Sequence, residues 1–104
     1  MIDKIKTEIA IIEVLKTVYD PEISSNVYDL GLVYEININD EGYVNVTMTL
    51  TAPGCPVAGE IIAEVDRKVR TIQGVSDVNV MLTFDPPWNK EMMSEEAKFE
   101  LGFL

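Results

Sequence analysis

The most restrictive feature of this sequence is a pair of alternating segments joined by a short turn. Polar and apolar side chains alternate in residues 33–39 and again in residues 43–50, a pattern typical of half-buried β-strands. The segment between them is Asn39-Asp40-Glu41-Gly42, whose glycine can adopt the positive φ that a tight turn requires. The sequence therefore predicts an antiparallel hairpin, with these side chains facing the core: Val44, Val46, Met48 and Leu50.

Helical patterns flank the hairpin. Residues 3–19 predict a helix that begins at Asp3 and ends before Pro21. We expect its core face to carry Ile5, Ile9, Ile12, Leu15 and Tyr19. Residues 56–73 predict a second amphipathic helix closed by Gly74, and alternation from Val78 to Phe84 predicts a third strand. A strand-helix-strand crossover would make this strand parallel to the second strand of the hairpin.

The C-terminal stretch predicts a short helix after a break. Asp85-Pro86-Pro87-Trp88 ends the third strand, Ser94 can cap a helix, and Gly102 can stop it. We expect this apolar tail to pack onto the rest of the chain, and a surface for a partner or a dimer is the alternative. Residues 1–104 are expected to form a single domain of the two-layer α/β (α+β) class: helix, hairpin, helix and strand, with a three-stranded mixed sheet and a short C-terminal helix.

Composition excludes several functions. Eighteen acidic and eight basic residues give a net charge of -10, so we expect no nucleic-acid and no membrane partner. The chain has one cysteine and no histidine, which removes any Cys-His catalytic pair and any metal site built from histidines or four cysteines. No secretory signal or long apolar run is visible, so we expect a cytoplasmic location. Because the chain lacks the thiolates of a permanent metal or cluster site, we expect no permanently bound cofactor.

The only cysteine lies in the loop Thr51-Ala52-Pro53-Gly54-Cys55-Pro56. Pro56 suits the first position of the second helix, which would make Cys55 its N-cap. A thiol at that position faces free backbone N–H groups and the positive end of the helix dipole, and both favour the thiolate. Pro53 and Gly54 would keep bulk away from the sulfur. The alternative is that Cys55 is a small apolar residue packed under the loop.

Topology predicts that three uncommon segments meet at one end of the sheet: residues 20–29, 51–56 and 85–88. Ligand sites favour that end of crossover units. The carboxylates of Asp20, Glu22 and Asp29 therefore join Cys55 as candidate site residues. Each also has a structural interpretation: Asp20 as a turn cap, Glu22 as a solvated side chain, and Asp29 as an acceptor for backbone N–H groups ahead of Gly31.

Four blocks of sequence together resemble one family: Asp20-Pro21-Glu22-Ile23, residues 28–33, residues 51–56, and Asp85-Pro86-Pro87-Trp88 with residues 93–97. The family includes the SufT and PaaD proteins and the eukaryotic cytosolic iron-sulfur targeting factor. The resemblance implies a fold akin to the C-terminal domain of NifU scaffolds and an accessory role in iron-sulfur protein maturation. It points to Cys55 first, and then to Asp20, Glu22 and Thr51 around it. PaaD-type members carry a cysteine-rich C-terminal extension that does not follow Leu104 here, which favours the SufT-like role.

On this resemblance the leading hypothesis is a non-catalytic accessory factor for iron-sulfur cluster assembly or delivery. Its partners would be the assembly machinery and client apoproteins, and Cys55 would be a transient ligand to iron or a cluster. A homodimer could supply a second thiolate. The alternatives are a thiol enzyme that uses Cys55 as nucleophile, and an interaction module in which Cys55 only packs and the tail from Trp88 to Leu104 binds a partner.

Overall fold

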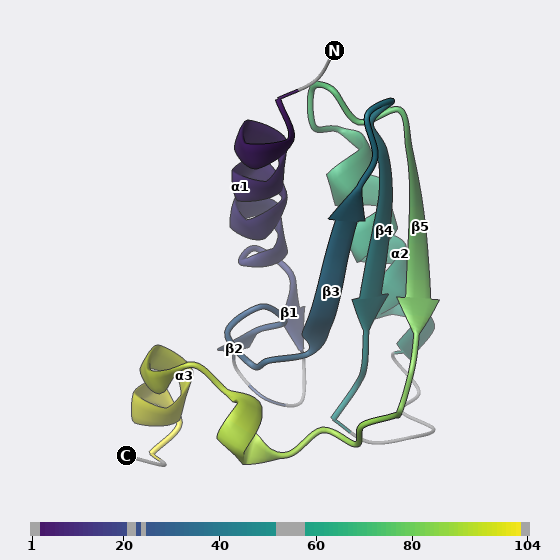
Figure 1. The fold of residues 1–104 in the computed structure, drawn as a ribbon. Helices are drawn as coiled ribbons and strands as arrows, with labels where there is room; N and C mark the ends of the chain where they lie inside the picture. The colour runs from purple at the N-terminus through teal and green to yellow at the C-terminus, as the bar shows by residue number, and fades with distance from the viewer. Residues whose placement is uncertain (1–2, 21–22, 24, 52–57, 103–104) are drawn as a thin grey trace.

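A three-stranded sheet with two helices on one face forms the body of the protein (Figure 1). The structure is a computed structural model that describes residues 3–20, 23, 25–51 and 58–102. The strands are β3 (Val33–Ile38), β4 (Tyr43–Met48) and β5 (Asp77–Leu82), in the order β3-β4-β5. β4 pairs antiparallel with β3 and parallel with β5. The predicted hairpin, crossover and fold class are therefore confirmed.

The core lies between the sheet and the helices α1 (Lys4–Leu15) and α2 (Ala58–Arg70). The inward side chains of β4 are fully buried against the apolar face of α2, as the alternation predicted. This core contact includes Val44, Val46 and Met48 from β4 and Ile61, Val65 and Val69 from α2. The opposite sheet face carries a polar row formed by Asn37, Asn45 and Asn79 across the three strands. The described elements thus form two layers, with both long helices on one face of the sheet.

The first helix differs from expectation in length and in its buried face. Asp3 caps it as predicted, its carboxylate accepting from the Lys6 N–H at 3.1 Å, but the helix ends at Leu15 rather than near residue 19. Its buried residues are Thr7, Ile11 and Leu15. The expected core residues Ile5, Ile9 and Tyr19 are exposed instead. The segment is apolar on two adjacent stripes, so the period alone could not choose between them, and packing selects the stripe that continues to Val18.

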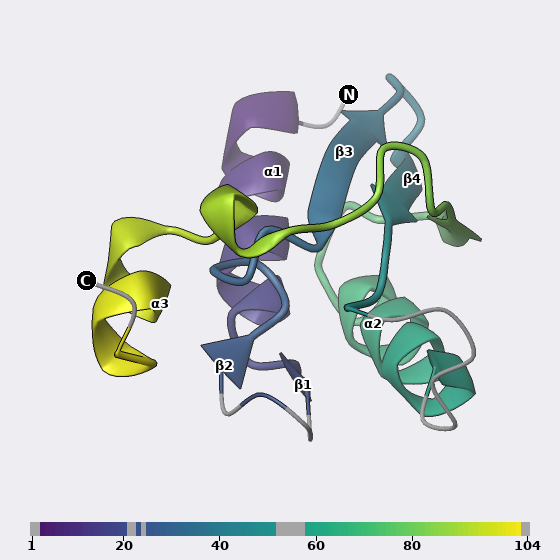
Figure 2. The ribbon, with the colours of Figure 1, turned by 90° about the horizontal axis from the view of Figure 1, so that it is seen from below.

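The connector between α1 and the hairpin contains a small sheet that the sequence did not reveal. Tyr19–Asp20 (β1) pairs antiparallel with Ser25–Asn26 (β2). Two-residue strands have no measurable period, which explains why this segment looked like a loop. The pair lies below α1, near the end of the sheet at which β4 and β5 finish (Figure 1), and Figure 2 shows the pair from that end.

The ends of α2 and β5 also differ from the prediction. α2 ends at Arg70 instead of Gln73, and a turn leads to Gly74, which has the expected positive φ of 96°. β5 ends at Leu82 rather than Phe84; its Val78 side chain is buried, but Leu82 and the following Phe84 are 41% and 39% exposed. The expectation that the whole strand alternates into the core is therefore wrong at its C-terminal end, where the helix layer of the described residues does not cover it.

The tail packs onto the body, as expected for its described part. It runs from β5 beneath the sheet to a short 3₁₀ turn (Lys90–Met92) and then to α3 (Glu95–Glu100) (Figure 1). Ser94 caps α3 by accepting from the Ala97 N–H, and Gly102 follows the helix with a φ of +83°. Met93 and Ala97 are buried, whereas Phe99 is exposed. In the described ranges, no helix is long and apolar enough to cross a membrane.

Candidate functional site

The candidate site lies at the end of the sheet where β4 and β5 finish, which we call the loop end. Just past Met48, Thr49 is fully buried, and its N–H donates to Leu32 O at 2.8 Å. Leu50 is buried and Thr51 is half-buried. α2 begins at Ala58, at the same end of the sheet, and runs back along it (Figure 1). The segment predicted to carry the chemistry is therefore bracketed on both sides by residues of the packed core.

The central residue of the candidate site lies outside the described residues. Residues 52–57 include Cys55 and its neighbours Pro53, Gly54 and Pro56, and Glu22 also falls outside the described ranges. The N-cap position of Cys55 and its thiolate character stay predictions. The first described turn of α2 carries one acidic residue, Glu60, and the last turn carries Arg67, Lys68 and Arg70. Acidic residues near the start of a helix and basic residues near its end interact favourably with the helix dipole.

Asp20 and Asp29 occupy different environments. Asp20 is only 2% exposed and belongs to β1, where it pairs with Ser25. Asp29 shares two hydrogen bonds with Asn26: the Asn26 Nδ2 donates to Asp29 Oδ2 at 2.9 Å, and the Asp29 N–H donates to Asn26 Oδ1 at 2.8 Å. The expected bonds from Asp29 to backbone N–H groups ahead of Gly31 are thus replaced by a side-chain pair. Asp29 helps to shape the connector.

Trp88 anchors the tail against this connector. Its indole N–H donates to Leu30 O at 2.7 Å, and its ring packs against the core. The backbone N–H of Ser94 donates to Asp29 O at 2.7 Å, so the tail is tied to the connector at two points. Gly31 completes the contact, because its φ is +79° and a Cβ there would overlap the Met92 carbonyl. The predicted segments 20–29 and 85–88 therefore lie close to one another, through contacts at and just beyond their ends, and residues 52–57 of the third predicted segment lie outside the described residues.

Tyr34 is a site residue that sequence reasoning missed. Its hydroxyl donates to Pro86 O at 2.8 Å and lies 3.6 Å from Met92 Sδ. Desolvation raises the pKa of Tyr34, and a hydrogen bond with Thr49 partly offsets the rise. The phenol consequently stays protonated near neutral pH and remains a donor. Its partner in the tail is 52 residues away in sequence, so no local pattern could have signalled the contact.

An open apolar hollow of about 520 Å³ adjoins this contact, lined by Gly31, Val33, Tyr34, Pro86 and Met92. Within the described residues, no group of three or more Asp, Glu, Cys or His side chains is arranged to hold a metal ion. These residues provide a framework of packed backbone around the loop end.

The fold defines a small two-layer α/β protein in which the connector and the tail meet at the loop end, where the described chain breaks between Thr51 and Ala58. Comparison with protein families then identifies the class: the sequence model described as "Iron-sulfur cluster assembly protein" matches residues 8–82. The chain belongs to this family. The match ends at the last residue of β5, so the tail lies beyond it.

Individual relatives agree with this assignment. The chain is 58% identical over 100 residues to an "Fe-S protein maturation auxiliary factor" of Porphyromonas gingivalis, covering 96% of this chain and 95% of the relative. It is 45% identical to the "Fe-S protein maturation auxiliary factor SufT" of Staphylococcus aureus, covering 82% and 97%. A crystal structure of a domain of unknown function from Bacillus anthracis superposes with a TM-score of 0.88 at 36% identity, covering 95% and 94%.

Proposed function

We propose that this protein is an accessory factor in iron-sulfur cluster assembly or delivery to client apoproteins. It acts in the cytoplasm through protein contacts and the Cys55 thiolate, and it is not itself an enzyme. The observation that carries the proposal is the 58% identity, over nearly the full length of both chains, to a protein named an Fe-S protein maturation auxiliary factor. The family match over residues 8–82 supports it independently of the tail.

The donor set of the chain sets the chemistry of the proposal. Iron and iron-sulfur clusters bind thiolates, and this chain offers one cysteine and no histidine. The remaining ligands must come from carboxylates such as Asp20 or Glu22, a cluster donor, a client, a small thiol or a second copy. A cluster held in this way is cargo in transit, because losing one external ligand releases it.

The framework residues support the loop in this proposal. Asp20 is buried, and it is proposed to orient the loop together with Glu22. Thr51 fixes the point at which the loop leaves the core, and Trp88 holds the tail beneath the connector. Asp29 keeps the connector in shape through Asn26. The loop itself comprises Thr51, Ala52, Pro53, Gly54, Cys55 and Pro56.

A cluster-transfer assay tests the proposal. Purified protein is mixed under anaerobic, reducing conditions with a labile cluster source and an apo-dehydratase, and the return of dehydratase activity is followed. Wild type should speed activation or raise its yield, and Cys55→Ser should lose that gain because serine is a poor ligand for iron at neutral pH.

A relocated thiol provides the matched control. Ser76 is exposed at the turn before β5, at the opposite end of the sheet from Thr51. The double variant Cys55→Ser with Ser76→Cys keeps one thiol per chain but moves it, so it should behave like Cys55→Ser. If the double variant restores transfer, the position of the thiol is irrelevant. If wild type has no effect on activation, the proposed function is wrong for this protein.

A further inference from the structure

The edge strand β5 is divided into a capped half and an open half. β5 borders the sheet on one side, since the strand order is β3-β4-β5. An exposed strand edge offers unpaired N–H and C=O groups to any other extended chain, and proteins normally block it with charges, prolines or bulges. Whether β5 can accept another strand therefore depends on which of its backbone groups are already satisfied.

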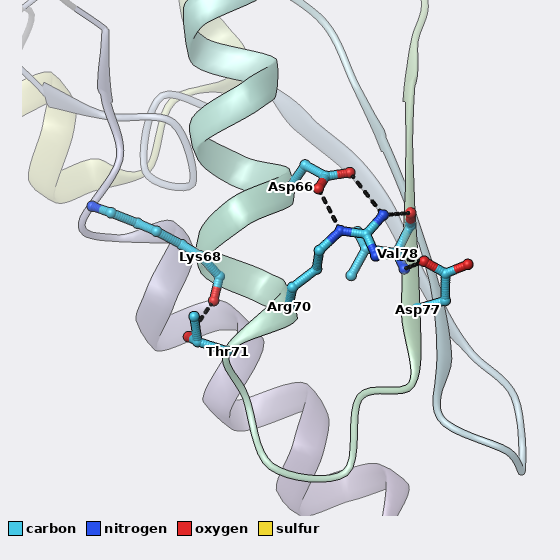
Figure 3. A network of polar contacts seen from close by, with 6 residues as sticks. All are labelled: Asp66, Lys68, Arg70, Thr71, Asp77 and Val78. Carbon is cyan, nitrogen blue, oxygen red and sulfur yellow. Dashed lines mark hydrogen bonds and ion pairs between the residues drawn. The ribbon is translucent and has the colours of Figure 1, made fainter.

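In the capped half of β5, side chains bind the outward backbone groups of Val78. The Arg70 Nη2 donates to Val78 O at 3.0 Å, and the Val78 N–H donates to Asp77 Oδ1 at 2.9 Å (Figure 3). Arg70 is itself held by ion pairs of 2.6 Å to Asp66 and 2.6 Å to Asp77. These bonds lower the pKa of Asp77 and raise that of Arg70, so both stay charged at neutral pH. Side chains from α2 and from β5 itself thus occupy both backbone groups of Val78.

The open half follows from the alternation of the ladder. The Thr83 N–H donates to Met48 O at 2.9 Å, so the backbone groups of Thr83 face β4. Every second residue of a strand faces the same neighbour, which directs Val78, Val80 and Leu82 outward. The capping of Val78 by side chains agrees with this direction. Among the contacts known for the described residues, no side chain caps Val80 or Leu82 in the same way.

The usual protections of an edge are absent from this half. Residues 77–84 contain no lysine, proline or glycine. The β4–β5 register runs unbroken over six pairs, whereas the other edge strand, β3, has a register shift between Val33 and Glu35. Around the open backbone, Met81, Leu82 and Phe84 are 52%, 41% and 39% exposed. Within the described part of the chain, the open half therefore combines uncapped strand backbone groups with apolar side chains, and it lies at the loop end.

We propose that Val80–Phe84 is a docking edge at which an extended segment of a partner polypeptide adds as a fourth strand. This inference rests on the proposed function, because the partner is taken to be a client or assembly protein brought beside the loop that carries Cys55. Only an extended chain can satisfy an alternating row of backbone donors and acceptors. The capped Val78 limits the added strand to the loop-end half of β5.

The negative charge of the chain determines which kind of partner segment the docking edge attracts. The chain carries a net charge of -10, so association of two copies along this edge is opposed by repulsion, and a basic segment is attracted. The docking edge itself has no charged side chain between Asp77 and Asp85. The occupant is therefore an apolar extended segment flanked by lysine or arginine, rather than a second copy of this chain.

A peptide titration followed by amide NMR tests the inference without any cluster. The probe is a synthetic peptide of alternating valine and threonine between terminal lysines, and its counterpart carries terminal glutamates. We expect the lysine peptide to shift the amide signals of Val80 and Leu82 and to slow their hydrogen exchange by at least about tenfold, with little change at Val78. The glutamate peptide should bind at least about tenfold more weakly.

Variants fix the location of binding. Leu82→Lys places a like charge on the docking edge and should weaken the lysine peptide by at least about tenfold. Ile9→Lys is the matched control, because Ile9 is an exposed apolar residue on α1. It should bind like wild type, and circular dichroism verifies that both variants are folded. In any variant that fails to fold, the wild-type shift map still decides.

Three results would overturn the inference. They are no perturbation of Val80 and Leu82 at millimolar peptide, perturbations centred on α1 or β3, and β5 shifts that depend on protein concentration without peptide. The last would assign the edge to a second copy. None of these results bears on cluster transfer, so loss of the docking edge and loss of the proposed function are separately detectable.

Discussion

Replacing Gly31 by alanine should displace the tail from the connector. Gly31 has a φ of +79°, a conformation that costs an L-residue about 1–2 kcal/mol. The new Cβ would also overlap the Met92 carbonyl, with the Met92 carbonyl carbon only 2.7 Å away. Relief requires the tail to move, which breaks the hydrogen bonds from Trp88 to Leu30 and from Tyr34 to Pro86. Each of these two bonds contributes about 1 kcal/mol. Added to the backbone strain, they bring the total loss to at least about 3 kcal/mol.

Gly102→Ala provides the control for backbone strain alone. Gly102 has a similar φ of +83°, but nothing lies within 4 Å of the position that an alanine Cβ would take there. Its substitution should cost about 1 kcal/mol or less, since it lies at the end of α3. The difference of about 2 kcal/mol between the two variants should separate their melting temperatures by about 8–16 °C.

Two measurements check this reasoning. Chemical denaturation gives the free energy of unfolding of each variant, and the emission of Trp88, the only tryptophan, reports whether the tail is docked. Gly31→Ala should shift the emission to longer wavelength before unfolding and lower the denaturant slope, because less surface remains to be exposed. If Gly31→Ala and Gly102→Ala have equal stabilities and unshifted emission, the tail is not packed on Gly31 and the reasoning is refuted.

Three further predictions address charge, core and capping. Hydrogen bonds from the Val78 N–H and from Arg70 lower the pKa of Asp77 in the folded protein, so its charge stabilises the fold above the unfolded pKa and this contribution is lost as pH falls through the folded pKa. The stability difference between wild type and Asp77→Asn should be present at pH 7 and shrink progressively below about pH 4, and a constant difference would contradict the assignment. Leu32→Ala, in the fully buried core, should lose about 2–5 kcal/mol in denaturation, while exposed Phe99→Ala stays within about 0.5 kcal/mol. Ser94→Ala removes the cap bond to the Ala97 N–H and should cost about 1 kcal/mol, whereas Ser94→Asp should retain most of that stability.

Much of the fold was predictable because its signals are local. Strict alternation and the positive φ of Gly42 fix the hairpin, and Asp3 and Ser94 are capping residues at the starts of α1 and α3. The buried face of α1 was not predictable, because the helix is apolar on two neighbouring stripes and tertiary packing chose between them. Leu82 and Phe84 alternate like core residues, yet no helix residue of the described chain covers them.

The candidate site was predictable only in outline. The predicted directions of the three strands placed the connector, the cysteine loop and the tail at one end of the sheet. The hydrogen bond from Trp88 to Leu30 shows that the connector and the tail are in contact. The contact of Tyr34 with Pro86 and the pairing of Asn26 with Asp29 were missed, since hydrogen-bond partners follow from three-dimensional packing. Cys55 was chosen from its residue type and family resemblance, and its role stays a prediction.

Complementation in cells that lack this gene tests the central claim most directly. The cells receive wild type or Cys55→Ser at equal protein level, and the activity of an iron-sulfur dehydratase is measured beside that of an enzyme that needs no cluster. We predict that only the dehydratase falls in the deletion strain and that wild type, but not Cys55→Ser, restores it. Full dehydratase activity without the gene would contradict the maturation role, and full rescue by Cys55→Ser would contradict the role of the thiolate.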